Sequence, residues 1–148
     1  MPEVDSTTPD VWTGTHHVRI PVADLDAARA FWERVLGYVW DFDFPGEAGP
    51  LGSAMRRASG GPNIVLWRAP ALAAAAAGFT VLGIGVPDRA AIERVRDRLD
   101  AQRIEHGGLQ PAFVEVKLPA VKTPGGALIA FYVQPDAAVA PASVLPEK

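Results

Sequence analysis

A chain of 148 residues with 49% apolar and 21% charged residues has the composition of an ordinary globular domain, long enough to bury a hydrophobic core. Its formal net charge of −3 gives no basic surface for nucleic acid, and the lack of cysteine excludes disulfides, thiolate metal ligands and a cysteine nucleophile. No stretch approaches the ~20 apolar residues of a membrane helix, and the first residues carry no signal-peptide pattern, so we expect a cytoplasmic protein without a membrane partner.

Residues 15–38 predict a strand, a tight turn and an amphipathic helix. Polar and apolar residues alternate over 16–22, which is the period of a strand with one buried face. Asp24 is then suited to cap a helix, and apolar residues recur at helical spacing over 25–36. Gly37 follows at the position where a left-handed residue commonly ends a helix.

Three further strands complete the first half of the chain. The segment 39–44 alternates aromatic and acidic residues, 51–57 is a short second strand, and 63–68 is a third strand after a Gly-rich turn. The Gly and Pro residues between the first two of these strands predict a loop. The Ala-rich segment 69–78 that follows predicts a short helical linker, because alanine is the best helix former.

The order of elements then begins again. The predicted elements of the second half are a strand at 80–86, a helix at 91–101 after a potential N-cap at Asp88, a short strand at 104–106, and strands at 113–118 and 128–133. The segments 1–14 and 135–148 are expected to be flexible tails, because they are rich in polar residues, Ala and Pro.

Two pairs of segments are similar across the two halves. Residues 17–24 (HVRIPVAD) align with 81–88 (VLGIGVPD), and both end in Val-x-Asp before a helix. Residues 60–67 align with 125–132, where a Gly-Gly turn leads into an apolar strand. Because both matches occur in the same order, the sequence predicts a repeat of strand, helix and three strands.

This repeat predicts an α+β fold made of two βαβββ modules in a single domain over 15–134. Module one covers 15–68 and module two covers 79–134, with the Ala-rich linker 69–78 between them. A strand and an amphipathic helix cannot bury their apolar surfaces alone, so each module needs the rest of its sheet.

Several motifs together are typical of one large family. They are His17-Val18-x-Ile20-x-Val22-x-Asp24, Phe31-Trp32, Leu36-Gly37-Tyr38 and Pro124-x-Gly126-x-x-Ile129-x-Phe131. On these residues the chain resembles the vicinal oxygen chelate superfamily, which includes glyoxalase I, extradiol dioxygenases and bleomycin-resistance proteins. The resemblance implies that the modules form a cup-shaped mixed sheet around a small-molecule site, and it implies a homodimer. The cup would be completed within one chain or across the dimer.

The resemblance also implies four metal-ligand positions, one on each key strand. These positions are His17, Val65, Val81 and Ala130. Only the histidine has a donor atom, whereas zinc and iron sites need at least three protein ligands. Glu115 on the same face would be a second ligand, which is too few without Asp41, Asp43 or a partner chain. We therefore predict no metal site and no cofactor, with a divalent metal as the alternative.

Strand alternation assigns the side chains to two faces of the sheet. One face is apolar throughout and is expected to lie under the helices. The opposite face combines aromatic and ionisable side chains, as ligand cavities do. The candidate ligand-binding residues are Arg19, Trp40, Trp67, Phe113, Lys117 and Tyr132.

The aromatic members of this set are expected to stack an aromatic or flat ligand, and ordinary core packing is the alternative. Arg19 or Lys117 would suit an anionic group of the ligand, whereas an Arg19–Glu115 ion pair or plain solvation are the other interpretations. His17 and Glu115 are the candidate catalytic pair. The strand residues Phe42, Asp43 and Phe44 and the Gly/Pro loop that follows them are a candidate lid.

The leading hypothesis is a metal-independent small-molecule-binding protein that holds an aromatic or flat ligand in the cup. The alternative is an enzyme of the same superfamily. It would be a metal-free isomerase or cyclase that uses His17 and Glu115, or a lyase or dioxygenase with a displaced metal site. A third hypothesis is an inert scaffold or regulatory partner without a ligand, which a cavity filled by side chains would indicate.

Overall fold

The computed structural model describes residue 11 and residues 14–59 and 62–135, which fold into two four-stranded sheets and three helices. The predicted tails 1–14 and 135–148 lie almost entirely outside the described residues. None of the three described helices is long and apolar enough to cross a membrane.

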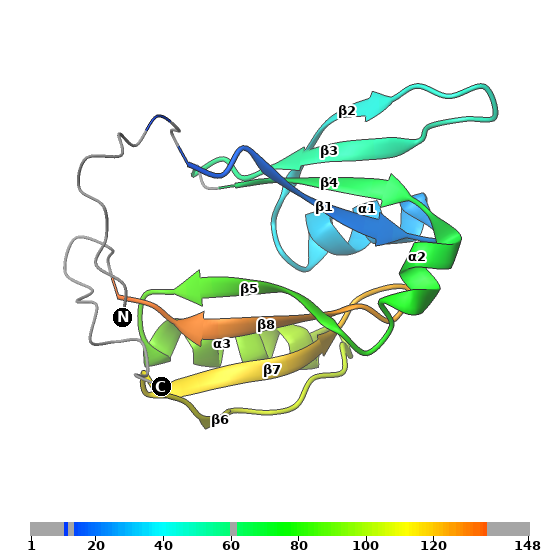
Figure 1. Cartoon of the computed structure of the whole chain (residues 1–148). Helices are drawn as coiled ribbons and strands as arrows, with labels where there is room; N and C mark the ends of the chain where they lie inside the picture. Colours follow the sequence, from blue (N-terminus) through cyan, green and yellow to red (C-terminus); the bar gives the residue numbers. More distant parts are fainter. Residues whose placement is uncertain (1–10, 12–13, 60–61, 136–148) are drawn as a thin grey trace, which may run out of the picture.

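The two modules predicted from the repeat are confirmed (Figure 1). Module one consists of β1 (His17–Val22), α1 (Leu25–Arg34), β2 (Val39–Phe44), β3 (Gly52–Arg56) and β4 (Asn63–Arg68). Module two consists of β5 (Thr80–Val86), α3 (Arg89–Ala101), β6 (Gln110–Pro111), β7 (Val116–Lys122) and β8 (Leu128–Val133). The helix α2 (Pro70–Ala75) joins them within the Ala-rich linker.

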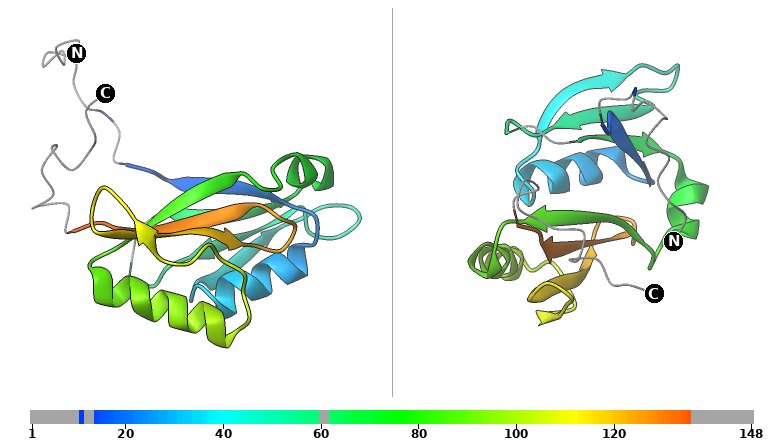
Figure 2. Two further views of the ribbon diagram at one scale, coloured as in Figure 1. Left: turned by 90° about the horizontal axis from the view of Figure 1, so that it is seen from below. Right: turned by 60° about the vertical axis from the view of Figure 1, so that its left-hand side comes forward.

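Each sheet has the same mixed topology. The strand orders are β1-β4-β3-β2 and β5-β8-β7-β6. In the first sheet β1 runs parallel to β4, in the second β5 runs parallel to β8, and the other neighbouring strands are antiparallel. The helices α1 and α3 lie on the same side of the two sheets (Figure 2, left). The opposite side of both sheets faces the viewer in Figure 1, and we call it the open face.

Both long helices begin at the predicted capping residues. The Asp24 carboxylate accepts a hydrogen bond from the backbone N–H of Ala27 at 3.0 Å, and the Asp88 carboxylate accepts one from Ala91 at 2.8 Å. Each cap satisfies a backbone donor that has no partner inside its helix. The Val-x-Asp motif of the repeat therefore ends a strand and starts a helix in both modules.

A single hydrophobic cluster of buried residues draws on both modules. Phe31 of α1 is 6% exposed, and Ile92 and Leu99 of α3 are at most 1% exposed. The two helices also touch, because the Arg98 guanidinium donates a 2.8 Å hydrogen bond to the main-chain oxygen of Arg34. The helix side of the sheets is therefore the core.

The last part of module two differs from the predicted strand at 113–118. Strand β7 begins later, after a bend at 113–115 in which Glu115 has a φ of 54°, outside the extended conformation of a regular strand. The strand also runs further than predicted, because a bulge accommodates Pro119, which has no N–H for the ladder. The short strand predicted at 104–106 does not form there, and β6 follows it in the chain instead.

Candidate functional site

The open face of module one is aromatic. Trp67 on β4, Gly52 on β3 and Phe44 on β2 are in register, so their side chains point the same way, opposite to the buried Leu66. The rings of Phe44 and Trp67 meet edge to face with centroids 5.6 Å apart, and Phe42 meets Phe44 in the same manner at 5.1 Å. Aromatic pairs of this geometry contribute about 0.5–1.5 kcal/mol each beyond their burial.

Arg19 adds a positive charge to this aromatic surface. Its side chain leaves β1 on the open face, and its guanidinium carbon lies 4.5 Å from the centroid of the Trp67 ring. A guanidinium held over an indole face is attracted by the ring's quadrupole. Among the residues that the structure describes, Arg19 has no carboxylate within ion-pair distance, so the alternative Arg19–Glu115 pair does not form.

Trp40 lies on the opposite face from the one expected. The register of β2 against β3 shifts between Trp40 and Phe42, which leaves Asp41 as an extra residue. Because side chains alternate between the two faces of a sheet, one extra residue moves every following side chain of the strand to the opposite face from the one that simple alternation predicts. Trp40 therefore lies on the helix side, where the Arg29 guanidinium is 5.2 Å from the centroid of a Trp40 ring. Phe42 and Phe44 face the open side instead.

Asp43 gathers a polar cluster on the helix side of the same strand. Its carboxylate accepts hydrogen bonds from the Ser53 hydroxyl at 2.6 Å and the Trp40 indole at 2.9 Å, and it pairs with Arg29 at 3.4 Å. Partial burial raises the pKa of Asp43, but these hydrogen bonds and the Arg29 charge outweigh it and hold the pKa below the usual range. The cluster fixes β2 to α1 and takes no part in the open face.

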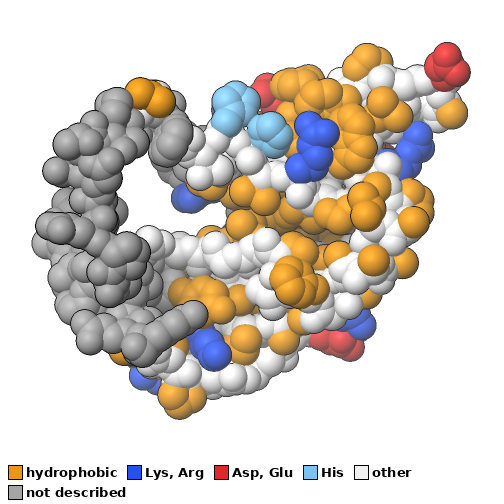
Figure 3. All heavy atoms as spheres, in the orientation of Figure 1, with side chains coloured by type: hydrophobic (Ala, Val, Ile, Leu, Met, Phe, Trp, Pro, Cys, Tyr) orange, Lys and Arg blue, Asp and Glu red, His pale blue; other side chains and the backbone are white. Residues whose placement is uncertain are grey.

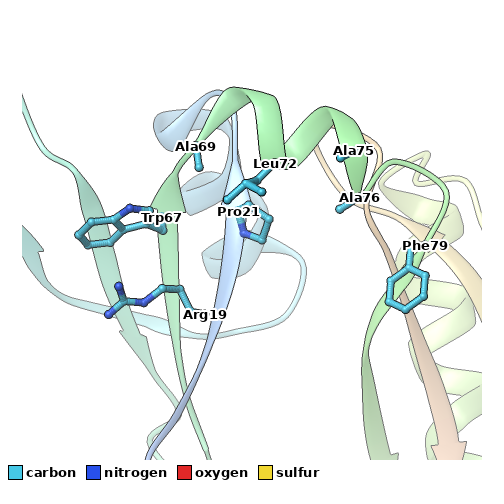
Figure 4. Close-up of a pocket in the computed structure, with 8 residues that line it drawn as sticks. All are labelled: Arg19, Pro21, Trp67, Ala69, Leu72, Ala75, Ala76 and Phe79. Carbon is cyan, nitrogen blue, oxygen red and sulfur yellow. The ribbon is translucent and has the colours of Figure 1, made fainter.

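A cleft of about 570 Å³ opens beside the Arg19–Trp67 pair (Figure 4). Trp67 and Arg19 lie at one end of it and Phe79 lies at the other, with Pro21 and Leu72 between them. Alanines of α2 and its flanks complete the wall. The Ala-rich linker thus forms one side of the cleft, and this volume lies in the range of small-molecule sites.

The open face of module two carries an aromatic ring and a lysine. Tyr132 lies opposite Lys117 in the β7–β8 register, and its ring lies over Gly83, where an added Cβ would be only 3.2 Å from a ring carbon. Phe113 lies in the bend before β7 and is 62% exposed. The structure therefore keeps Lys117 and Tyr132 on the predicted face but brings neither into the cleft with Arg19 and Trp67.

The candidate catalytic residues are not joined. His17 on β1 contacts its neighbour, with the Nδ1 atoms of His16 and His17 3.0 Å apart, so one nitrogen donates and the other accepts. Glu115 is an exposed residue of the bend before β7. Within the described part of the chain, no hydrogen bond or ion pair connects His17 with Glu115. The roles of both residues stay predictions.

The four family positions for metal ligands do not fit a metal. The structure places Val65 and Ala130 on the open face as buried hydrocarbon side chains, 5% and 1% exposed, and Val81 is half-buried. Only His17 offers a donor atom. No group of three or more His, Asp or Glu side chains that could hold an ion occurs among residues 14–59 and 62–135.

Sequence reasoning missed four large side chains of this region. The sequence pattern favours a lid for Phe42 and Phe44, because the bulge that turns their side chains to the open face leaves no mark in a pattern of alternating residues. Leu72 and Phe79 lie in and beside an alanine run that reads as a plain linker. Their signal in the sequence is that they are the large apolar residues of that stretch. The structure leaves Leu72 63% exposed and Phe79 68% exposed.

The model of the glyoxalase/bleomycin resistance protein/dioxygenase superfamily matches residues 16–136. A match over so much of the chain, together with the paired modules, defines the class of protein. The chain belongs to this superfamily, and the resemblance predicted from the sequence motifs is confirmed. No curated protein sequence matches the chain.

Solved structures share the fold at low sequence identity. An antibiotic-binding protein from Streptomyces sp. CB03234 is 17% identical with a TM-score of 0.69, covering 84% of this chain and 98% of its own. A lactoylglutathione lyase from Agrobacterium tumefaciens is 16% identical with a TM-score of 0.65, covering 82% and 94%. A fosfomycin resistance protein from Listeria monocytogenes is 13% identical with a TM-score of 0.67, covering 82% and 91%. At these identities the similarity establishes the fold and not the function.

Proposed function

We propose that this protein binds a small aromatic or flat molecule on the open face of module one, without a metal. The observation that carries the proposal is the aromatic surface of Phe42, Phe44 and Trp67 beside an open cleft of about 570 Å³. A metal-centred site is disfavoured because hydrocarbon side chains occupy three of the four ligand positions of the family. The similarity to an antibiotic-binding protein supports a sequestering role.

The proposal is tested by ligand-dependent thermal stability. A molecule that binds only the native state stabilises it by RT ln(1 + [L]/Kd), about 2.7 kcal/mol at one hundred times Kd. We expect a panel of flat naphthalene, anthracene and phenanthrene derivatives to contain compounds that raise the melting temperature, whereas zinc, nickel, manganese and iron(II) leave it unchanged. A stoichiometric metal in protein purified without chelator would contradict the metal-independent proposal.

Trp67 and Trp40 form a matched pair of variants. Both are partly exposed tryptophans of the same sheet, but they lie on opposite faces. Trp67→Ala is expected to weaken binding of a compound from the panel at least about tenfold, because it removes the central stacking surface. Trp40→Ala is expected to leave the affinity within about twofold of the wild type. Equal losses in both variants would contradict a site on the open face.

The homodimer implied by the family remains part of the proposal. Light scattering coupled to size-exclusion chromatography is expected to give twice the chain mass of 15.7 kDa. A monomeric mass would contradict the homodimer and would mean that a single chain forms the binding site.

The alternative function is an enzyme of the same superfamily. The similarity to a lactoylglutathione lyase and to a fosfomycin resistance protein favours it, and His17 with Glu115 would be the acid–base pair. Turnover of a bound compound, with a pH–rate profile governed by a histidine and abolished in His17→Ala, would establish the enzyme. If the wild type and His17→Ala both bind the compound without turnover, binding is the only function that remains supported.

A further inference from the structure

Among the residues that the structure describes, the cleft beside α2 has a single charged side chain on its walls. Arg19 is that residue, and the remaining walls are apolar, formed by Pro21, Trp67, Leu72 and Phe79 with alanines of the linker. Arg19 is exposed at one end of the cleft, so an anion that it binds stays partly solvated and the pair is screened by salt. The chemistry of the cleft therefore depends on what Arg19 is able to bind.

In the part of the chain that the structure describes, no acceptor forms a hydrogen bond with the Arg19 guanidinium. The Arg19 guanidinium carbon lies 4.5 Å from the centroid of the Trp67 ring. The five N–H donors of a guanidinium lie in its plane and point outward from its edge. A planar carboxylate accepts two of these donors side by side, which is the strongest common arrangement. Among the described residues no Asp or Glu is within ion-pair distance of Arg19.

We infer that the ligand of this cleft is a flat apolar molecule that carries a carboxylate or a similar planar oxyanion. The apolar body lies along Trp67 and between Leu72 and Phe79, and the anionic group meets the edge of the Arg19 guanidinium. This inference rests on the proposed function, because it names the ligand class of the same site. Arg19 is then the residue that selects anionic over neutral ligands.

The test compares acids with their neutral amides. The probes are naphthalene-2-carboxylate and naphthalene-2-carboxamide, with the corresponding anthracene and phenanthrene pairs, titrated into the full chain by calorimetry. We expect the carboxylate of at least one pair to bind about tenfold more tightly than its amide, which corresponds to about 1.4 kcal/mol. This preference is expected to shrink as salt is added, since the Debye length falls from about 30 Å at 0.01 M to about 3 Å at 1 M.

The variants separate charge from stacking. Arg19→Met keeps an apolar stem and is expected to bring the ratio of the two affinities close to one. Arg68→Met is the matched control: it removes one positive charge from the residue after Trp67, but Arg68 lines a different hollow beside Asp24. It is expected to leave the ratio unchanged. Phe79→Ala is expected to weaken acid and amide alike, because it trims the far wall of the cleft.

Each of the following outcomes would contradict one part of the inference. Equal binding of acid and amide by the wild type would overturn the anionic ligand while the proposed function stands. A preference lost equally in Arg19→Met and Arg68→Met would overturn the role of Arg19 and leave only the overall charge. If no compound of any pair binds with a Kd below about 1 mM, the inference and the proposed function both fail.

Discussion

The two modules place an aromatic ring at the same position of their last strand, yet the rings cover different things. In the aligned repeat, Trp67 corresponds to Tyr132 and Arg19 corresponds to Gly83. In module one the ring carries a guanidinium at 4.5 Å, whereas in module two the ring lies over a glycine. One fold unit therefore holds a guanidinium against its ring, whereas in its repeat the ring covers a glycine and the positive charge, Lys117, lies opposite the ring on β7.

This difference shows that the repeated strand pattern does not determine which side chains occupy the open face. Both modules keep apolar residues on the helix side, because burial there supplies most of the stability. The open-face positions are free of that requirement. The following predictions test how far the two modules differ in stability and in binding.

The largest effect is expected for Gly52→Ala in module one. An added Cβ would lie 2.5 Å from the main-chain oxygen of Leu66 and 2.8 Å from the Trp67 ring, and the backbone oxygen cannot move aside. We expect the free energy of unfolding to fall by about 2 kcal/mol, measured by urea denaturation. An unchanged denaturation midpoint would mean that β3 and β4 can separate without cost.

Asp43→Asn is expected to lower the free energy of unfolding by about 1–2 kcal/mol, because the buried Ser53 hydroxyl and the Arg29 charge lose a carboxylate partner. The matched variant Asp41→Asn removes a carboxylate from the same strand. Asp41 pairs only weakly with Arg56, at 3.8 Å, and both side chains are exposed, so the free energy of unfolding is expected to change by less than about 0.5 kcal/mol.

The pH dependence of stability is expected to trace to the same carboxylate. The pKa of Asp43 is lower in the folded than in the unfolded protein, so its contribution is complete above the unfolded pKa and is lost as pH falls through the folded pKa. The acid loss of stability should therefore be smaller in Asp43→Asn than in the wild type, measured by urea denaturation between neutral and acidic pH. Identical acid profiles would rule out Asp43 as the origin.

Tyr132→Ala is expected to weaken binding of a flat naphthalene carboxylate by about threefold or less, which is about 0.7 kcal/mol, because Tyr132 lies outside the cleft. Calorimetry on this variant and on Trp67→Ala compares equivalent positions of the two modules directly. A larger loss in Tyr132→Ala would mean that module two forms the main contact with the ligand.

The smallest effect is expected for Gly83→Ala, the counterpart of the Gly52 variant. Its Cβ would meet only the Tyr132 ring, at 3.2 Å, and that partly exposed side chain can shift by a few tenths of an ångström. Because alanine also reduces the freedom of the unfolded chain, we expect a net change within about 0.5 kcal/mol. A large loss would show that the Tyr132 ring is as firmly held as Trp67.

Figure 3 shows the open face: apolar side chains gather on it over both modules, with positive groups among them. The sequence predicted that composition from alternation alone at β1, β4 and β8, because these strands keep a regular period of two. Alternation failed at β2, where the extra residue Asp41 turned Trp40 to the helices and Phe42 to the open side. It failed again at 113–115, where Glu115 leaves the strand conformation.

The sequence by itself determined the two βαβββ modules, their capped helices and the identity of the family. These features depend on local signals, namely the period of apolar residues, the aspartate caps and the repeated motifs, which act within a few residues of one another. The metal prediction also came from residue chemistry, since valine and alanine have no donor atoms at any position in a fold.

Only the tertiary structure decided which side chains share the cleft. Arg19, Trp67 and Phe79 come from β1, β4 and the segment after α2, and their meeting depends on how strand pairing and helix packing place those elements. The bulge in β2 is likewise a property of the β2–β3 pair and of the Asp43 contacts with α1. Contacts between residues distant in the chain leave no periodic trace in a single sequence, so the site required the fold.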